Sequence, residues 1–141
     1  MTMTGLDTFD TSVQKSDVWL KEIMHKLHWD SRHQAYQALR TVLHILRDRL
    51  TIDEAADLGA QLPMVIRGIY YDEWKPSRSP SKIRSRDQFL EKVHQDFKGY
   101  QDIDAEELTR AVFQVIRSRV TEGEIEDVEG MLPEELRELW Q

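Results

Sequence analysis

Residues 51–71 read TIDEAADLGAQLPMVIRGIYY, and residues 121–141 read TEGEIEDVEGMLPEELRELWQ. The second stretch repeats the first at a spacing of 70 residues. Extending the alignment without a gap places residues 17–71 over residues 87–141 and gives 13 identical pairs. An internal repeat of this length fixes the architecture before any other signal does. The sequence therefore predicts a chain built from two related halves.

Each stretch carries the signals of two short helices. A Thr followed three residues later by Glu is a capping box, which marks a helix start. A proline is favoured in the first turn of a helix, and the residue before it is pushed out of the helical conformation. These signals occur at Thr51, Glu54 and Pro63, and they recur at Thr121, Glu124 and Pro133. We therefore expect a third and a fourth helix in each half.

Apolar residues at helical spacing predict two further helices in each half. In the first half, one runs from about Asp17 to His28 and a longer one begins after Ser31. In the second half the start signal, Asp104, comes three positions later than the repeat predicts, so we expect a longer loop and a shorter second helix there. No stretch alternates with the period of a strand. We predict an all-α fold, a tandem repeat of two four-helix modules with about eight helices, packed as one pseudo-twofold helical bundle.

Composition divides the chain into four segments. Residues 1–16 are polar and are expected to be disordered, and residues 17–74 form the first helical repeat. Residues 75–86 hold two prolines and four serines and are expected to form an exposed linker. Residues 87–141 form the second helical repeat. The formal net charge is −7, with −2 on the first repeat, −9 on the second and five cations without an anion on the linker.

Charge and composition also bear on location and partners. An acidic body is a poor surface for nucleic acid, which is bound by neutralising phosphates, so a nucleic-acid partner is not expected. The chain has no cysteine, no apolar run of membrane-spanning length and no signal-peptide pattern. We therefore predict a cytoplasmic protein that does not interact with membranes. A homo-oligomer is compatible with the sequence.

An aromatic and basic segment follows the first repeat directly, and it is the local enrichment most typical of a binding surface. Three large aromatic residues within five positions precede the five cations, and Tyr, Trp and Arg are the residue types favoured at binding hot spots. The alternative is that the rings seal the two modules together. The interaction candidates are Arg67, Tyr70, Tyr71, Trp74, Lys75, Arg78, Lys82, Arg84 and Arg86.

Repeated carboxylates at i, i+3 have the spacing of acid–base or metal-binding pairs. We favour a structural role instead: the Glu of each pair completes a capping box, and the Asp bonds an arginine at the corner between the second and third helices. The residues assigned this structural role are Arg47, Arg49, Thr51, Glu54, Asp57, Pro63, Arg117, Arg119, Thr121, Glu124, Asp127 and Pro133. No catalytic residue, cofactor-binding residue, metal ligand or cofactor is predicted.

Three stretches carry a resemblance to a known family. They are Leu-Pro-x-x-x-Arg-Gly-x-Tyr-Tyr-x-x-Trp at 62–74, the Trp/Phe-Leu pairs at 19–20 and 89–90, and Leu-Pro-x-Glu-Leu-Arg at 132–137. Together they resemble the bacterial family catalogued as domain of unknown function 2267, over roughly residues 17–141. The resemblance implies an all-helical tandem repeat, and it implies no catalytic residues.

Three functions remain open on the sequence alone. The first is a non-enzymatic helical interaction or adaptor module for a protein partner, with the basic linker steering acidic partners. The second is a small nucleic-acid-binding regulator in which short helices form a helix-turn-helix. The third is an enzyme or ligand binder with a pocket between helices, since such pockets need no sequence motif.

Overall fold

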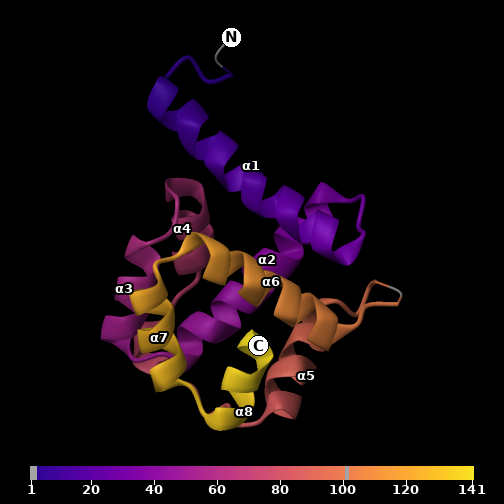
Figure 1. The fold of residues 1–141 in the computed structure, drawn as a ribbon, viewed down its shortest axis with the longest axis vertical. Coiled ribbons are helices and arrows are strands. Elements are labelled where there is room, and N and C mark those ends of the chain that lie inside the picture. Colours follow the sequence, from indigo (N-terminus) through magenta and orange to yellow (C-terminus); the bar gives the residue numbers. More distant parts are fainter. Residues whose placement is uncertain (1–2, 101) are drawn as a thin grey trace.

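The computed structural model describes residues 3–100 and 102–141. Within these residues the chain forms eight α-helices, two short 3₁₀ helices and no strand, which confirms the all-α prediction (Figure 1). The α-helices are α1 (Asp7–Leu27), α2 (Arg32–Arg49), α3 (Ile52–Ala60), α4 (Met64–Tyr71), α5 (Arg86–Asp96), α6 (Ala105–Arg119), α7 (Glu122–Met131) and α8 (Glu134–Arg137). The 3₁₀ helices are η1 (Pro76–Arg78) and η2 (Glu138–Trp140).

The helix starts lie where the capping residues predict them. Thr51 Oγ1 accepts a hydrogen bond from the backbone N–H of Glu54 at 3.2 Å, and Thr121 Oγ1 accepts one from Glu124 at 3.4 Å. Pro63 and Pro133 immediately precede α4 and α8. Helix α6 has 15 residues against 18 in α2, as the later start signal predicts.

Helices from both halves share one hydrophobic core. Helix α2 packs against α6, and α3 packs against α7, so equivalent helices of the two repeats meet. Helix α1 contacts α6, and its counterpart α5 contacts α2. A twofold relation between the two halves would produce this pattern, and the pseudo-twofold packing stays a prediction. Side chains such as Leu43 and Phe113 fill the core, and Phe113 stacks on Trp140 with ring centroids 4.2 Å apart.

The N-terminal segment differs from the sequence-based expectation. Helix α1 begins at Asp7, ten residues before the predicted start, so residues 7–16 are helical (Figure 1). Thr4 donates from both its N–H and its hydroxyl to Asp10, at 2.9 and 2.8 Å, and Ser12 Oγ accepts from the N–H of Val65 at 3.2 Å. These bonds hold the segment as a helix and attach it to α4. The expectation for residues 1–2 lies outside the described residues.

The linker at 75–86 is exposed for the most part, yet it is attached along the end of α2. Arg49 Nε donates to the carbonyl of Ile83 at 2.7 Å, and the N–H of Ser81 donates to the carbonyl of Asp48 at 2.6 Å. Ile83 is buried. Polar composition predicted the exposure, but it did not reveal these contacts.

Candidate functional site

The aromatic segment lies at the C-terminal end of α4. Tyr70 is fully buried, and its hydroxyl donates to the carbonyl of Ala55 in α3 at 2.7 Å. Tyr71 is half-buried between Tyr70 and Trp74, and Trp74 Nε1 donates to Ser79 Oγ at 3.2 Å. The polar contacts of these rings join α4 to α3 and to the linker. Tyr70 is therefore not accessible to a partner in this structure, and its contacts are those of the structural alternative for this ring.

Arg67, another interaction candidate, binds the end of α3. Its Nε donates to the carbonyl of Gly59 at 3.0 Å, and Nη2 donates to the carbonyl of Leu62 at 2.9 Å. The last carbonyls of a helix have no partner within the helix. The guanidinium satisfies them, so the contacts of Arg67 are those of a helix cap.

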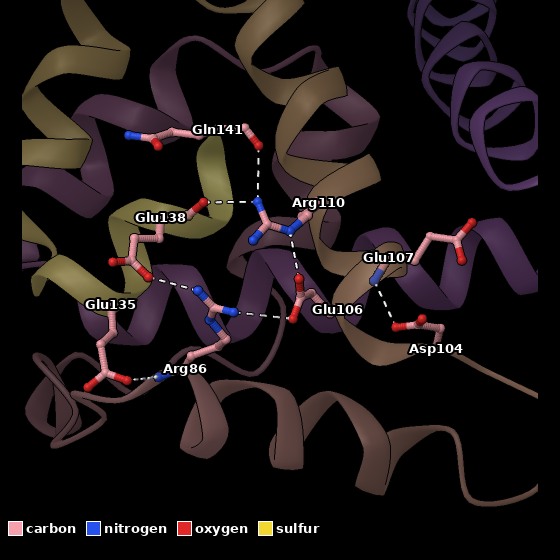
Figure 2. Close-up of polar contacts among 8 residues, drawn as sticks. All are labelled: Arg86, Asp104, Glu106, Glu107, Arg110, Glu135, Glu138 and Gln141. Atoms are coloured by element: carbon pink, nitrogen blue, oxygen red, sulfur yellow. Dashed lines mark hydrogen bonds and ion pairs between the residues drawn. The ribbon is translucent and has the colours of Figure 1, made fainter.

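The five linker cations separate into two groups. Arg86 is the first residue of α5; its Nη2 donates to Glu138 at 2.7 Å and its Nη1 lies 3.5 Å from Glu106, so it pairs with carboxylates of the acidic second half (Figure 2). The bond to Glu138, together with the neighbouring carboxylates, raises the pKa of Arg86. The other four are exposed and have no ion pair with any described residue: Lys75, Arg78, Lys82 and Arg84.

The second repeat also anchors its own C-terminus. Arg110 donates to Glu106 and to the carbonyls of Glu138 and Gln141, each at 3.0 Å (Figure 2). Arg40, its counterpart in the first repeat, pairs with Asp72 just beyond α4, at 2.9 Å. Arg40 and Arg110 therefore play the same part: each one binds the segment at the end of its own half of the chain.

The predicted Arg–Asp corner is absent from the described residues. Arg47 is buried and donates to the carbonyls of Tyr70 and Asp72, at 2.7 and 3.0 Å. The other repeated arginines bind elsewhere: Arg49 the carbonyl of Ile83, Arg117 the carboxylate of Glu129 and Arg119 the carboxylate of Glu22. The prediction failed because the last arginines of α2 bind α4 and the linker, and the last arginines of α6 bind α7 and α1.

The carboxylates themselves come together where α3 meets α7. Oxygen atoms of Glu54, Asp57 and Glu124 all lie within 4.8 Å of one another. Glu54 is 6% exposed, and Oε2 of Glu54 and Oε2 of Glu124 are buried without a hydrogen-bond partner among the described residues. We call these three residues the carboxylate cluster. The interpretation that Glu54 and Glu124 only cap helices is thus incomplete: their N–H groups do bind the threonines, but their side chains point into the cluster.

The electrostatics of the cluster are dominated by negative charge. Burial raises the pKa of Glu124 to about 8, and the nearby carboxylates of Glu54, Asp57 and Asp127 contribute in the same direction. Burial and nearby like charges both disfavour the ionised carboxylate. These contributions all favour the protonated form of Glu124.

A groove lies on another face, between α1, α2 and α4. It has a volume of about 330 Å³ and an almost wholly apolar lining. Helix α1 contributes Val13 and Leu20, α2 contributes Tyr36 and Leu39, and α4 contributes Val65, Ile66 and Ile69, with Ser16 and Asp17 as the polar members. The sequence analysis missed this groove because two of its lining residues, Val13 and Ser16, belong to residues 7–16, which were expected to be disordered. The helical spacing of Leu6, Phe9 and Val13 was the signal that could have found it.

These features define an all-α protein with an apolar groove and a carboxylate cluster. Among the described residues, no helix is long and apolar enough to cross a membrane. The model of the family described as "Uncharacterized conserved protein (DUF2267)" matches residues 16–139. The chain belongs to this family, which confirms the resemblance seen in the sequence. A comparison with curated proteins gives no match.

Proposed function

We propose that this protein is a non-enzymatic interaction module whose groove between α1, α2 and α4 binds the apolar face of an amphipathic helix from a protein partner. The observation that carries the proposal is the apolar lining of the groove together with the exposed apolar residues beside it. Val65, which lines the groove, is 40% exposed, and Phe9, one helical turn before the lining residue Val13 on α1, is 52% exposed. Contiguous exposed apolar surface on a small protein is typical of an interaction site.

The apolar lining of the groove comes from three helices, α1, α2 and α4, each of which contacts the other two. Amphipathic helices bind such grooves through apolar side chains at i, i+3, i+4 and i+7. Phe9 and Val13 are four residues apart on α1 and so share one face, which continues the apolar surface along α1 beyond the groove. A partner helix placed alongside α1 would cover both.

The exposed cations of the linker suit a partner with an acidic segment. Lys75, Arg78, Lys82 and Arg84 are exposed on a segment that α2 holds in place. Complementary charge accelerates encounter more than it strengthens the final complex. The linker therefore acts on the rate of association, and the groove supplies the affinity.

Two matched substitutions test the groove. Val65 lies in it, and Val18 lies on a different face of α1; both side chains are 40% exposed. Val65→Asp and Val18→Asp therefore add the same charge at equal exposure. The tagged parent and both variants are first used to capture partner proteins. A peptide with the sequence of the amphipathic helix of the captured protein is then titrated by calorimetry into each purified chain.

The proposal expects the parent and Val18→Asp to bind this peptide and Val65→Asp to lose at least about tenfold in affinity, because a charge cannot be buried in an apolar groove without a partner. Circular dichroism melts confirm that both variants fold. Equal affinity of the two variants contradicts the proposal. The proposal is also contradicted if the parent is a dimer and Val65→Asp is a monomer, because the groove is then occupied by a second copy of the chain.

A further inference from the structure

The carboxylate cluster differs from ordinary capping glutamates. In a complete capping box the Glu side chain accepts a hydrogen bond from the N–H of the capping residue. Helix α5 has such a box, formed by Ser85 and Gln88. At α7 the N–H of Thr121 donates instead to Gln61 Oε1 at 3.3 Å, and the Glu124 carboxylate points towards α3. Helix capping therefore does not account for where these side chains lie.

Burial makes the position of Glu54 costly. Its side chain is more than nine-tenths buried, and its Oε2 has no hydrogen-bond partner among the described residues. An unpaired buried carboxylate is strongly destabilising unless it takes up a proton or coordinates a metal ion. The Oε2 atom of Glu124 is buried in the same way. Two such oxygens on facing helices are an independent indication of a missing positive charge.

The spacing of the oxygens fits a hard divalent cation. Ca²⁺ binds oxygen ligands at about 2.3–2.6 Å, so two ligands on opposite sides of the ion are about 4.6–5.2 Å apart. The three oxygens of the cluster lie within 4.8 Å of one another. Oxygens at these separations need to move by only a few tenths of an ångström at most to bind one such ion together, and water can complete the shell of Ca²⁺.

We propose that Glu54, Asp57 and Glu124 form a binding site for a divalent cation of the size of Ca²⁺. Because Glu54 and Asp57 belong to α3 and Glu124 belongs to α7, the bound ion links the first repeat to the second. Asp127, on α7, lies close enough to act on Glu124 and adds negative charge near the ion. This site is separate from the groove, so it does not rest on the proposed function.

Metal titration of purified protein, after removal of bound metal with a chelator, tests the site. The variants are Glu124→Gln and Glu54→Gln, and the control is Glu126→Gln, an exposed carboxylate on the same helix. CaCl₂ is titrated by calorimetry and by thermal melts, and Tb³⁺, a Ca²⁺ analogue, is followed by luminescence excited through nearby tyrosine. Tyr70 is the nearby ring, since the charges of Glu54 and Glu124 both act on its hydroxyl.

The parent and Glu126→Gln should bind one Ca²⁺ per chain, with a rise in melting temperature and sensitised Tb³⁺ emission. Each ligand variant should lose at least about tenfold in affinity, because even the loss of an outer-shell group costs about 10- to 100-fold. Without metal, Glu124→Gln should melt no lower than the parent, so its loss of binding does not reflect unfolding. Absence of Ca²⁺ binding to the parent overturns the proposal, as does equal binding by all four proteins.

Discussion

Glu54 of α3 and Glu124 of α7 occupy the same position in the two repeats, and their carboxylate oxygens lie within 4.8 Å of each other. Contact between equivalent helices brings each repeated residue on the contacting face close to its own copy. A repeated hydrophobic residue then pairs with a hydrophobic residue, but a repeated glutamate meets a glutamate. The internal repeat thus concentrates negative charge at the α3–α7 contact.

The metal-free protein should lose stability as pH rises through the range in which Glu124 titrates. Its pKa is raised from 4.5 to about 8, so between these values the folded chain holds a proton that the unfolded chain releases. The free energy of unfolding therefore falls with rising pH across this window and levels off above about pH 8. The facing acidic groups are Glu54, Asp57 and Asp127.

The glutamine side chain in Glu124→Gln cannot titrate. The free energy of unfolding of this variant should therefore fall much less than that of the parent over the same pH range. Above about pH 8 the variant should be more stable than the parent by about 1 kcal/mol, the order expected when one of two nearby like charges is removed in a partly solvated site. Urea unfolding in the presence of a chelator at several pH values measures the difference. Parallel stability curves for parent and variant would show that Glu124 titrates normally.

Arg47→Met should destabilise the fold by about 2–4 kcal/mol. Arg47 is 3% exposed and binds the carbonyls of Tyr70 and Asp72, so its loss leaves buried acceptors unpaired. Its counterpart in the second repeat, Arg117, has a side chain that is 47% exposed and pairs with Glu129. Arg117→Met should therefore change stability by no more than about 1 kcal/mol. Chemical denaturation of both variants compares them; similar losses would mean that Arg47 is not the anchor of α4.

The fold could be predicted largely from local signals. Thr51, Thr121 and the Leu-Pro pairs mark helix boundaries through chemistry that acts within a few residues, so the alignment located them correctly. The start of α1 could not be predicted in this way. Residues 7–16 are polar in composition, and they are held by a contact between Ser12 and Val65, 53 positions apart.

The candidate sites were harder to predict because each depends on contacts distant in sequence. The spacing of Glu54 and Asp57 indicated a carboxylate pair, but only the α3–α7 contact adds Glu124. Nearby arginines in the sequence suggested a partner for Asp57, whereas Arg47 binds α4 instead. Proximity along the chain was therefore a poor guide to side-chain pairing at the corner between helices.

Arg86→Gln should lower the melting temperature at low salt and have a smaller effect at high salt. Arg86 pairs with Glu138 and Glu106 of the acidic second repeat, and surface ion pairs of this kind contribute up to about 1 kcal/mol and are screened by salt. Arg84→Gln is the matched control, because Arg84 is exposed and has no ion pair with a described residue. A difference between the two variants that does not change with salt would exclude an electrostatic role for Arg86.

Photo-cross-linking from the groove tests the central claim most directly, namely that the groove between α1, α2 and α4 binds a partner's helix. A benzophenone amino acid replaces Val65 in one protein and Val18 in the other, at positions of equal exposure on different faces. The account predicts that, in the cell that produces the protein, the benzophenone at position 65 cross-links to one apolar face of an amphipathic helix in a partner. The benzophenone at position 18 should give no such cross-link. Identical cross-link patterns from both positions, or cross-links from Val65 only to this chain itself, would contradict it.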